Sequence, residues 1–472
     1  MVFSSCLFLL YFLPAFLIVY FLTGKKYRNY VALLASIVFY GFGSPKFLVT
    51  LLVAIIIDFF IVREIDRSEA PKRRKLFLVF SIILNLGLLA YFKYANFFID
   101  NINALLSAFG GNPIKWTRVI LPIGISFFTF QKLSYSVDVY RKTSVPLKSI
   151  FDYALFIMLF PQLIAGPIVR YCEISEQIRQ RDYRWSECLH GFYRFVIGLC
   201  KKILIADVLG TQVDLWLAGD IASMGFTTAW ITVLAYSLQL YFDFSGYSDM
   251  AIGLGRIMGF KFPENFDNPY NSASINEFWR RWHQTLGVFM RNYLYIPLGG
   301  NRVSKSRTYF NLWVVFLLSG LWHGANWNFV IWGVYHGLFI VSERLFLNRF
   351  YERIGRIPSV ILTFFIVVVG WAIFRIENLN ELWIFLGKLF SFNFSDWRVL
   401  ADAHFFTTLI VALFFSFFCL LPLGRKVQQK VFYSDYSNKG HAVAWVLAMA
   451  ALVFCIAALN AADFSPFIYF RF

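Results

Sequence analysis

EFWRRWHQTLGVFMRNYLYIPLGGNR (277–302) and, after a short polar turn, NLWVVFLLSGLWHGANWNFVIWGVYHG (311–337) form the stretch that organises this chain. Its first half alternates basic and aromatic residues around His283. In its second half, His323 stands where one strongly apolar run breaks and the next begins. Titratable groups at membrane depth are costly, and they are usually retained because they serve a function. The stretch therefore predicts that the two histidines share one buried site.

The composition is that of a membrane protein. Of 472 residues, 59% are hydrophobic and 15% are charged, whereas soluble domains carry about 25% charged residues. The mean hydropathy is +0.61. Several apolar runs are long enough to cross a hydrocarbon core of about 30 Å. We therefore expect an all-α polytopic membrane protein, a single domain over 1–472 with roughly ten to twelve transmembrane helices plus re-entrant and interfacial helices.

The net charge of +17 is explained by topology. The basic residues cluster in short segments between apolar runs, which is typical of cytoplasmic loops and disfavours a nucleic-acid-binding function. Residues 1–22 are predicted to be an uncleaved span, because they have no positive n-region and no small-residue cleavage site. Lys25, Lys26 and Arg28 follow at once, and a second basic cluster covers 63–75. Both clusters predict that the N-terminus faces outward, away from the cytoplasm.

The remaining runs differ in character. The segment 121–142 contains Gly, Pro, Ser and Gln, so we expect it to line a protein interior or a wet cavity. The run 150–169 is also broken by Pro and Gly. Residues 93–117 look interfacial, and 171–190 are predicted to form a surface helix. Further spans are predicted near 30–43, 47–62, 76–92, 191–217, 227–243, 326–345, 358–376, 405–422 and 441–460.

The segment around His283 is predicted to be one amphipathic helix at the membrane interface. At helical spacing, one face carries Trp279, His283, Leu286 and Met290. The neighbouring basic cluster suits either a plain surface anchor or a grip on a phosphate-bearing donor. We expect donor or substrate binding by Arg280, Arg281, Arg291, Asn301, Arg302, Trp322 and Asn326, with Lys305 and Arg307 adding to the basic cluster.

His323 is the candidate catalytic base. Imidazole has an unperturbed pKa near 6.5, and burial favours its neutral, proton-accepting form. Such a base deprotonates a hydroxyl as it attacks a thioester, and contributes a factor of about 10² to 10⁴ in rate. No Asp, Glu or His stands beside His323 at ligand spacing, so no metal site is expected. His336 is interpreted as a packing or helper residue.

QLYFDFSGYSDMAIGLG (239–255) carries acidic and hydroxyl groups inside an aromatic, glycine-rich run. Asp243, Ser245 and Asp249 are expected to form a polar network. The structural interpretation is a hydrogen-bonded network between packed helices. The functional interpretation is that Asp243 or Asp249 orients a catalytic group.

Together these segments resemble the membrane-bound O-acyltransferase (MBOAT) family, in its bacterial branch typified by alginate O-acetyltransferase. The resemblance covers most of the chain; the core motifs fall within 121–345, and the helices of 358–460 are less characteristic. It rests on VFSS (2–5), PIGISFFTF (122–130), LIAGPIVR (163–170), QLYFDFSGYSDMAIGLG (239–255), FWRRWH (278–283), YLYIPLGGNR (293–302) and GLWHGANW (320–327).

The resemblance implies helices around a central tunnel or funnel, with His323 matching the family's catalytic histidine and His283 its second position. It also implies transfer of an acetyl group from acetyl-CoA, with no bound cofactor, across the bacterial inner membrane to a periplasmic partner that modifies an exopolysaccharide. QTLGVFM (284–290) departs from the serine-rich pattern of that branch. The acceptor is therefore open: it could be alginate, cellulose or peptidoglycan, and D-alanyl transfer to teichoic acid is a further alternative within the family. Alternatives of another class are a saccharide transporter and a non-catalytic scaffold.

Overall fold

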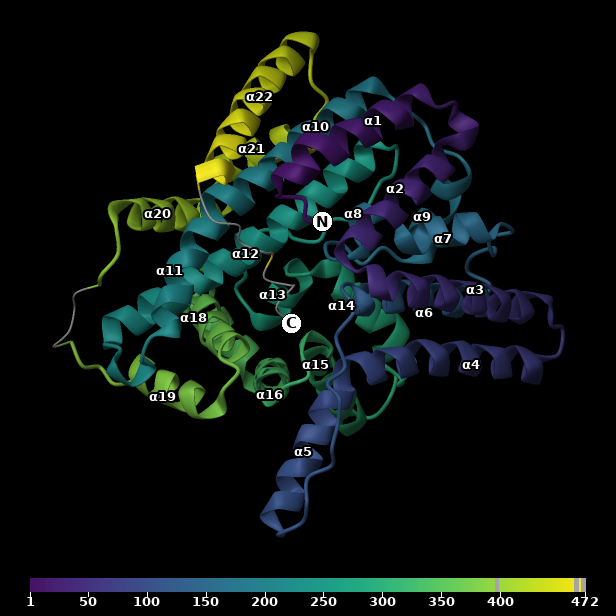
Figure 1. Cartoon of the computed structure of the whole chain (residues 1–472). Coiled ribbons are helices and arrows are strands. Elements are labelled where there is room, and N and C mark those ends of the chain that lie inside the picture. The colour runs from purple at the N-terminus through teal and green to yellow at the C-terminus, as the bar shows by residue number, and fades with distance from the viewer. Residues whose placement is uncertain (395–398, 462–466, 468–472) are drawn as a thin grey trace. The chain divides into compact units, whose positions relative to one another are not determined.

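The computed structural model describes residues 1–394, 399–461 and Phe467, and in these residues it contains helices and no strand. The expected all-α fold is confirmed. The chain divides into two compact units: Met1–Arg184 with Met258–Pro263, and Trp185–Ile257 with Glu264–Phe472. The elements carry the labels of Figure 1. The expectation of a single domain stays a prediction.

The first unit holds helices α1 to α9. In it, α6 packs against α3 and α4. The polar side chains of α6, such as Gln131, Ser134 and Ser136, are buried, so this segment lines protein as its composition indicated. The elements are η1 (Leu7–Phe12), α1 (Leu13–Leu22), η2 (Lys25–Tyr27), α2 (Arg28–Gly43), α3 (Pro45–Arg67), α4 (Pro71–Leu89), η3 (Ala90–Tyr94), α5 (Ala95–Ala108), α6 (Ile125–Tyr140), α7 (Ile150–Met158), α8 (Phe160–Leu163) and α9 (Tyr171–Arg179).

The second unit contains both histidines of interest. Its elements are α10 (Trp185–Cys200), η4 (Lys201–Ala206), α11 (Asp207–Ala218), η5 (Ile221–Ser223), α12 (Phe226–Ile257), η6 (Pro269–Asn271), α13 (Ile275–Arg281), α14 (Gln284–Met290), η7 (Arg291–Tyr295), α15 (Lys305–His323), α16 (Trp327–Ser342), η8 (Glu343–Leu347), α17 (Asn348–Ile354), α18 (Arg356–Arg375), α19 (Leu379–Leu389), α20 (Ala403–Phe417), η9 (Phe418–Leu420), α21 (Pro422–Phe432) and α22 (Asn438–Ala461).

Helix α12 is the central element of this unit. Every residue from 235 to 255 is buried, so this part of the helix faces protein on all sides. The span predicted near 227–243 is longer than expected, because α12 continues without a break to Ile257 and includes the polar residues of 239–255. The polar groups of this run bond to neighbouring helices instead of interrupting the helix.

Two glycine pairs bring α12 against α10. A Cβ atom on Gly198 would lie 2.5 Å from the carbonyl oxygen of Gly246, and one on Gly191 would lie 2.6 Å from that of Gly253. Small residues at such crossings let two backbones approach closely. Asp249 lies between the two α12 glycines and Arg194 between the two α10 glycines. The crossing therefore places opposite charges face to face inside the unit.

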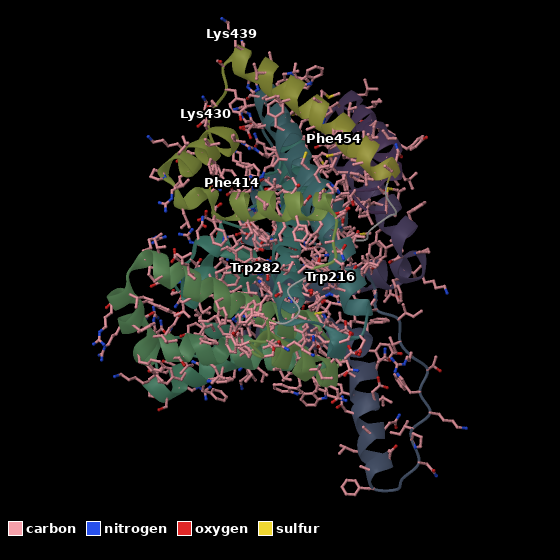
Figure 2. All side chains as sticks on the ribbon, turned by 90° about the vertical axis from the view of Figure 1, so that its left-hand side faces the viewer. Trp216, Trp282, Phe414, Lys430, Lys439 and Phe454 are labelled. Atoms are coloured by element: carbon pink, nitrogen blue, oxygen red, sulfur yellow. The ribbon has the colours of Figure 1, made fainter. Side chains whose placement is uncertain are left out.

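Six helices in the described residues are long and apolar enough to cross a membrane: Pro45–Arg67, Pro71–Ala108, Trp327–Ile354, Arg356–Arg375, Ala403–Leu420 and Asn438–Ala461. The chain is a multi-pass membrane protein. Phe414 on α20 and Phe454 on α22 are exposed on these helices (Figure 2), as residues facing lipid are. The expected total of ten to twelve crossings stays a prediction.

Two local predictions differ from the structure. The single surface helix predicted over 171–190 is two helices, because α9 ends at Arg179 and α10 begins at Trp185. Helix α19, over Leu379–Leu389, was not predicted.

Candidate active site

His323 is the last residue of α15. A Cβ atom on the next residue, Gly324, would lie 1.9 Å from the ring of Phe329, so only glycine lets the chain pass directly from α15 toward α16. Asn326 caps α16: its Oδ1 atom accepts from the backbone N–H of Trp327 at 2.6 Å, and its Nδ2 atom donates to the carbonyl of Glu377 at 3.5 Å. This tight corner fixes the position of His323.

Aromatic rings enclose the imidazole of His323. The centroids of Trp322, Trp332 and Phe374 lie 4.9, 5.2 and 5.2 Å from its own. These rings come from α15, α16 and α18, and the side chain of His323 is buried. These rings and the burial of the side chain keep the imidazole of His323 out of bulk water.

His283 does not lie on a continuous amphipathic helix, and that prediction was wrong. Helix α13 ends at Arg281, and His283 adopts a left-handed conformation, with φ of 45°, before α14 begins at Gln284. A non-glycine residue in this region is uncommon and costs free energy, so it persists where the surroundings fix it. The break turns the imidazole inward, and His283 is 1% exposed.

Asn265 fixes the tautomer of His283. Its Oδ1 atom lies 2.9 Å from His283 Nδ1 and accepts a second hydrogen bond from Thr285 Oγ1, also at 2.9 Å. Its Nδ2 atom donates to Ser248 Oγ at 3.0 Å. Because an amide oxygen can only accept, Nδ1 of His283 carries the ring proton and Nε2 carries the lone pair.

The Nε2 atom of His283 is able to act as an acceptor. Within the described part of the chain it has no hydrogen-bond partner. Burial lowers the pKa of His283 to about 3, because the protein interior disfavours the charged ring. At neutral pH the site therefore holds a neutral imidazole whose basic nitrogen is fixed by its hydrogen bond to Asn265.

The ring of Trp322 lies close to both histidines. Its ring centroid is 6.0 Å from that of His283 and 4.9 Å from that of His323, and its side chain is 4% exposed. The edge of Phe244, from α12, closes the far side of His283 at 4.7 Å. The structure thus brings both predicted histidines and Trp322 into one buried aromatic cluster.

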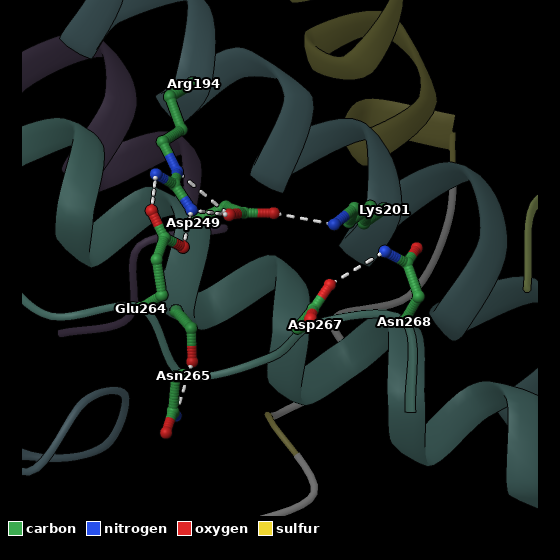
Figure 3. A network of polar contacts seen from close by, with 8 residues as sticks. Arg194, Lys201, Asp249, Glu264, Asn265, Asp267 and Asn268 are labelled. Carbon is green, nitrogen blue, oxygen red and sulfur yellow. Dashed lines mark hydrogen bonds and ion pairs between the residues drawn. The ribbon is translucent and has the colours of Figure 1, made fainter. Parts of the chain in front are cut away.

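The acidic residues of α12 form ion pairs. Asp243 lies 2.8 Å from Nζ of Lys202, which also pairs with Asp207 at 2.6 Å. Asp249 accepts hydrogen bonds from Arg194 and Lys201, as Figure 3 shows. Asp249 and its two cations thus form a polar network between packed helices. Ser245 is buried but has no hydrogen-bond partner among the described residues, so the expected network that includes it stays a prediction. An orienting role of Asp243 or Asp249 stays a prediction.

Ser248 and Asn265 connect this network to the histidine. Ser248 is next to Asp249 on α12, and Asn265 is next to Glu264 in the segment that follows α12. Neither Asn265 nor Thr285 was selected from the sequence. Asn265 stands in a segment without a periodic pattern, and Thr285 is not on the helical face that was assigned to His283. The polar content of FPENFDNPY (262–270) is the one signal that pointed there.

The residues expected to bind the donor lie mostly at the surface. Arg280, Arg291 and Arg302 are exposed, and Arg281 pairs with Glu277 at 2.7 Å. Asn301 is exposed as well; it accepts hydrogen bonds from Tyr295 and, at 3.4 Å, from Arg344. These groups are available to a soluble anion, whereas Trp322 lies inside with the histidines.

The chain is similar to known proteins over most of its length. The sequence model of the membrane-bound O-acyltransferase family matches residues 130–374. The chain is 40% identical, over 527 aligned residues and the full length of both chains, to the probable alginate O-acetylase AlgI of Pseudomonas aeruginosa. It is 41% identical over 490 aligned residues, which cover the full length of both chains, to the probable alginate O-acetylase AlgI of Pseudomonas putida. It is 37% identical over 416 residues to the peptidoglycan O-acetyltransferase of Helicobacter pylori, covering 81% of this chain and 78% of that one.

Proposed function

The chain belongs to the membrane-bound O-acyltransferase family, and on this premise we propose that it moves an acetyl group across the bacterial inner membrane for the O-acetylation of alginate. It is an O-acyltransferase of a polysaccharide-modification pathway. Acetyl-CoA is the cytoplasmic donor, and a periplasmic protein of the same pathway receives the acetyl group or directs it to the polymer. The N-terminus faces the periplasm, since Lys25, Lys26 and Arg28 follow the first apolar helix.

The paired histidines around Trp322 are the observation that carries this proposal. His323 takes the proton of the acceptor hydroxyl as its oxygen attacks the thioester carbonyl carbon. The C–O bond forms, the C–S bond breaks, and the proton passes to the departing thiolate, so the imidazole ends neutral. His283, with its lone pair fixed on Nε2, positions the reacting groups. The aromatic cluster excludes water that would hydrolyse the thioester.

The exposed arginines supply the donor's binding energy. CoA carries several phosphate charges, and guanidinium groups hold phosphates by paired, charge-assisted hydrogen bonds. Arg280, Arg291 and Arg302 stand in the segment that carries His283 and leads to α15. Donor phosphates bound at the surface would leave the thioester end free to enter the buried site.

The test uses proteoliposomes with acetyl-CoA, radiolabelled in the acetyl group, outside and acceptor oligosaccharide with the periplasmic partner inside. We expect label on the internal oligosaccharide with wild-type protein and none with His323→Ala. His441→Gln, a change at a histidine outside the cluster, should transfer normally. Equal labelling by His323→Ala, with intact folding shown by an unchanged Tm, overturns the assignment of the base.

The same assay separates the alternatives. Muropeptide acceptors in place of alginate oligomers test peptidoglycan acetylation, the reaction named for the Helicobacter pylori relative. A D-alanyl thioester on a carrier protein tests the teichoic-acid route. A transporter moves sugar without acetyl transfer, and a scaffold keeps polymer synthesis intact when both histidines are lost.

A further inference from the structure

A cavity lies between α10, η4, α12, α20, α21 and α22, and its lining includes Asn265 but neither His283 nor His323. Its volume is about 850 Å³, within the range of roughly 300–1,000 Å³ typical of small-molecule sites. Most of its lining is aliphatic or aromatic. Val411 and Phe415 of α20 and Leu447 of α22 line it and are also exposed. These exposed lining residues stand on two helices of membrane-spanning length, so a molecule from the bilayer can reach the cavity there.

Four residues of alternating charge line this cavity, and Figure 3 shows the contacts between them. Lys201 pairs with Asp249 at 2.6 Å, Asp249 with Arg194 at 2.9 Å, and Arg194 with Glu264 through hydrogen bonds of 2.6 and 2.5 Å. The two inner members are closed off, with side-chain exposures of 7% for Arg194 and 9% for Asp249. All four line the cavity. The cavity therefore combines a mostly apolar lining with a group of ion-paired side chains that can bind a polar ligand group.

The two ends of the row are the parts open to a ligand. The side chain of Lys201 is 23% exposed and that of Glu264 is 33% exposed. The row is therefore neutral in sum but presents a cation at one end and an anion at the other. The hydroxyl of Ser245 also lines the cavity, and it has no hydrogen-bond partner among the described residues. The complementary headgroup is a zwitterion with an anion next to a hydrogen-bonding cation.

We propose that this cavity binds a phosphatidylethanolamine molecule from the bilayer, with the phosphate at Lys201 and the ammonium at Glu264. The acyl chains would occupy the apolar walls and pass out between α20 and α22. A choline headgroup has no N–H to donate to Glu264, and an anionic headgroup would bring a second negative charge toward Asp249 and Glu264. The chemistry therefore selects a primary ammonium.

This site is joined to the catalytic side of the unit. Ser248 and Asn265 line the cavity, and Asn265 holds His283 Nδ1 at 2.9 Å. A headgroup seated on Glu264 would lie beside the residue that fixes the tautomer of His283. The proposal itself concerns binding, so it can fail or stand whatever polymer the enzyme acetylates.

Native mass spectrometry of the purified full-length protein tests the proposal by counting retained phospholipids. The wall variant is Ala448→Phe, which fills the cavity, and the matched control on the same helix is Ala450→Phe, which changes an exposed position outside it. We expect wild type and Ala450→Phe to retain one phosphatidylethanolamine and Ala448→Phe to lose it. Retention by Ala448→Phe equal to the control overturns the site. Ala451→Phe gives a second wall position if Ala448→Phe does not fold.

The headgroup assignment is tested in nanodiscs that contain equal parts of phosphatidylethanolamine, phosphatidylcholine and phosphatidylglycerol. We expect the wild type to retain phosphatidylethanolamine over phosphatidylcholine by about tenfold, the size of one hydrogen bond to a charged group. Glu264→Gln should reduce that preference several-fold. Equal retention of the choline lipid, or a preference for the glycerol lipid, overturns the assignment.

Discussion

The Nδ1 atom of His283 lies 2.9 Å from the Oδ1 atom of Asn265. This contact decides which ring nitrogen is basic, because Asn265 uses its amide N–H on Ser248 and can offer His283 only its oxygen. The imidazole proton therefore faces Asn265, and the lone pair on Nε2 faces away from it. A residue from the segment after α12 thus sets the proton state of a histidine between α13 and α14.

The first prediction concerns Asn265. Asn265→Ala removes the acceptor that fixes the tautomer, so we expect acetyl transfer to fall by about 10- to 100-fold, the usual effect of losing an outer-shell partner of a functional imidazole. Asn265→Asp keeps an acceptor oxygen and should recover most of the activity. Initial rates at several pH values report the result.

A purely structural role of Asn265 would give a different pattern. In that case the Ala and Asp variants would lose rate in proportion to their loss of Tm. Rescue by Asp at a Tm no higher than that of the Ala variant supports tautomer control, and failure of that rescue contradicts it.

The second prediction is a pH dependence of stability. The pKa of His283 is about 3 in the folded protein and about 6.5 in an unfolded chain. Between these values the unfolded chain binds a proton that the folded protein does not, so the free energy of unfolding falls as the pH falls below 6.5. One such group contributes a slope of about 1.4 kcal/mol per pH unit.

His283→Asn removes this titration. In detergent solution the variant should therefore lose less stability than the wild type between pH 6.5 and pH 5, and the two should differ by a constant amount above pH 7.5. Chemical unfolding at fixed pH values measures this. If the free energies of unfolding of the two proteins differed by the same amount at every pH, His283 would titrate in the folded protein as it does in the unfolded chain, which would contradict the prediction.

The third prediction concerns the crossing of α10 and α12. Gly198→Ala places a Cβ atom 2.5 Å from the carbonyl oxygen of Gly246, and backbone atoms cannot move aside cheaply. We expect a loss of about 1–3 kcal/mol, as for an overpacked core. The matched control is Gly387→Ala on α19, where a Cβ atom meets nothing within 4 Å. The control should gain about 0.5–1 kcal/mol. A Gly198→Ala variant as stable as the control contradicts the close crossing.

Much of this architecture follows from hydrophobic pattern, and the site follows only in part. Apolar runs located the helices, because burial in lipid or protein requires continuous apolar surface. Both histidines and Trp322 were selected from the motifs around them. The break before His283 was missed, because a single left-handed residue leaves the helical spacing of its neighbours unchanged.

Hydrophobic periodicity does not predict contacts between segments that are far apart in the sequence. Asn265 reaches His283 across 18 residues, and no periodicity links the two positions. The acidic residues of α12 were selected, but their partners Arg194, Lys201 and Lys202 were not, although charges inside an otherwise apolar run are the same kind of signal. Which cation meets which carboxylate depends on the glycine-mediated crossing of α10 and α12, a property of three-dimensional packing.

The last prediction concerns the exposed arginines. Arg280 is exposed, whereas the neighbouring Arg281 is held by Glu277 at 2.7 Å. If Arg280 binds donor phosphates, its contact is the same in the ground state and the transition state. Arg280→Ala should therefore raise the KM for acetyl-CoA by about three- to tenfold with little change in kcat.

The effect of Arg280→Ala on KM should shrink as the salt concentration rises, because an exposed ion pair is screened within about 10 Å at 0.1 M. Arg349→Ala on α17, another exposed arginine, is the matched control and should leave KM unchanged. A fall in kcat at constant KM would instead place Arg280 at the reacting atoms, and equal KM values for the two variants would remove it from the donor site.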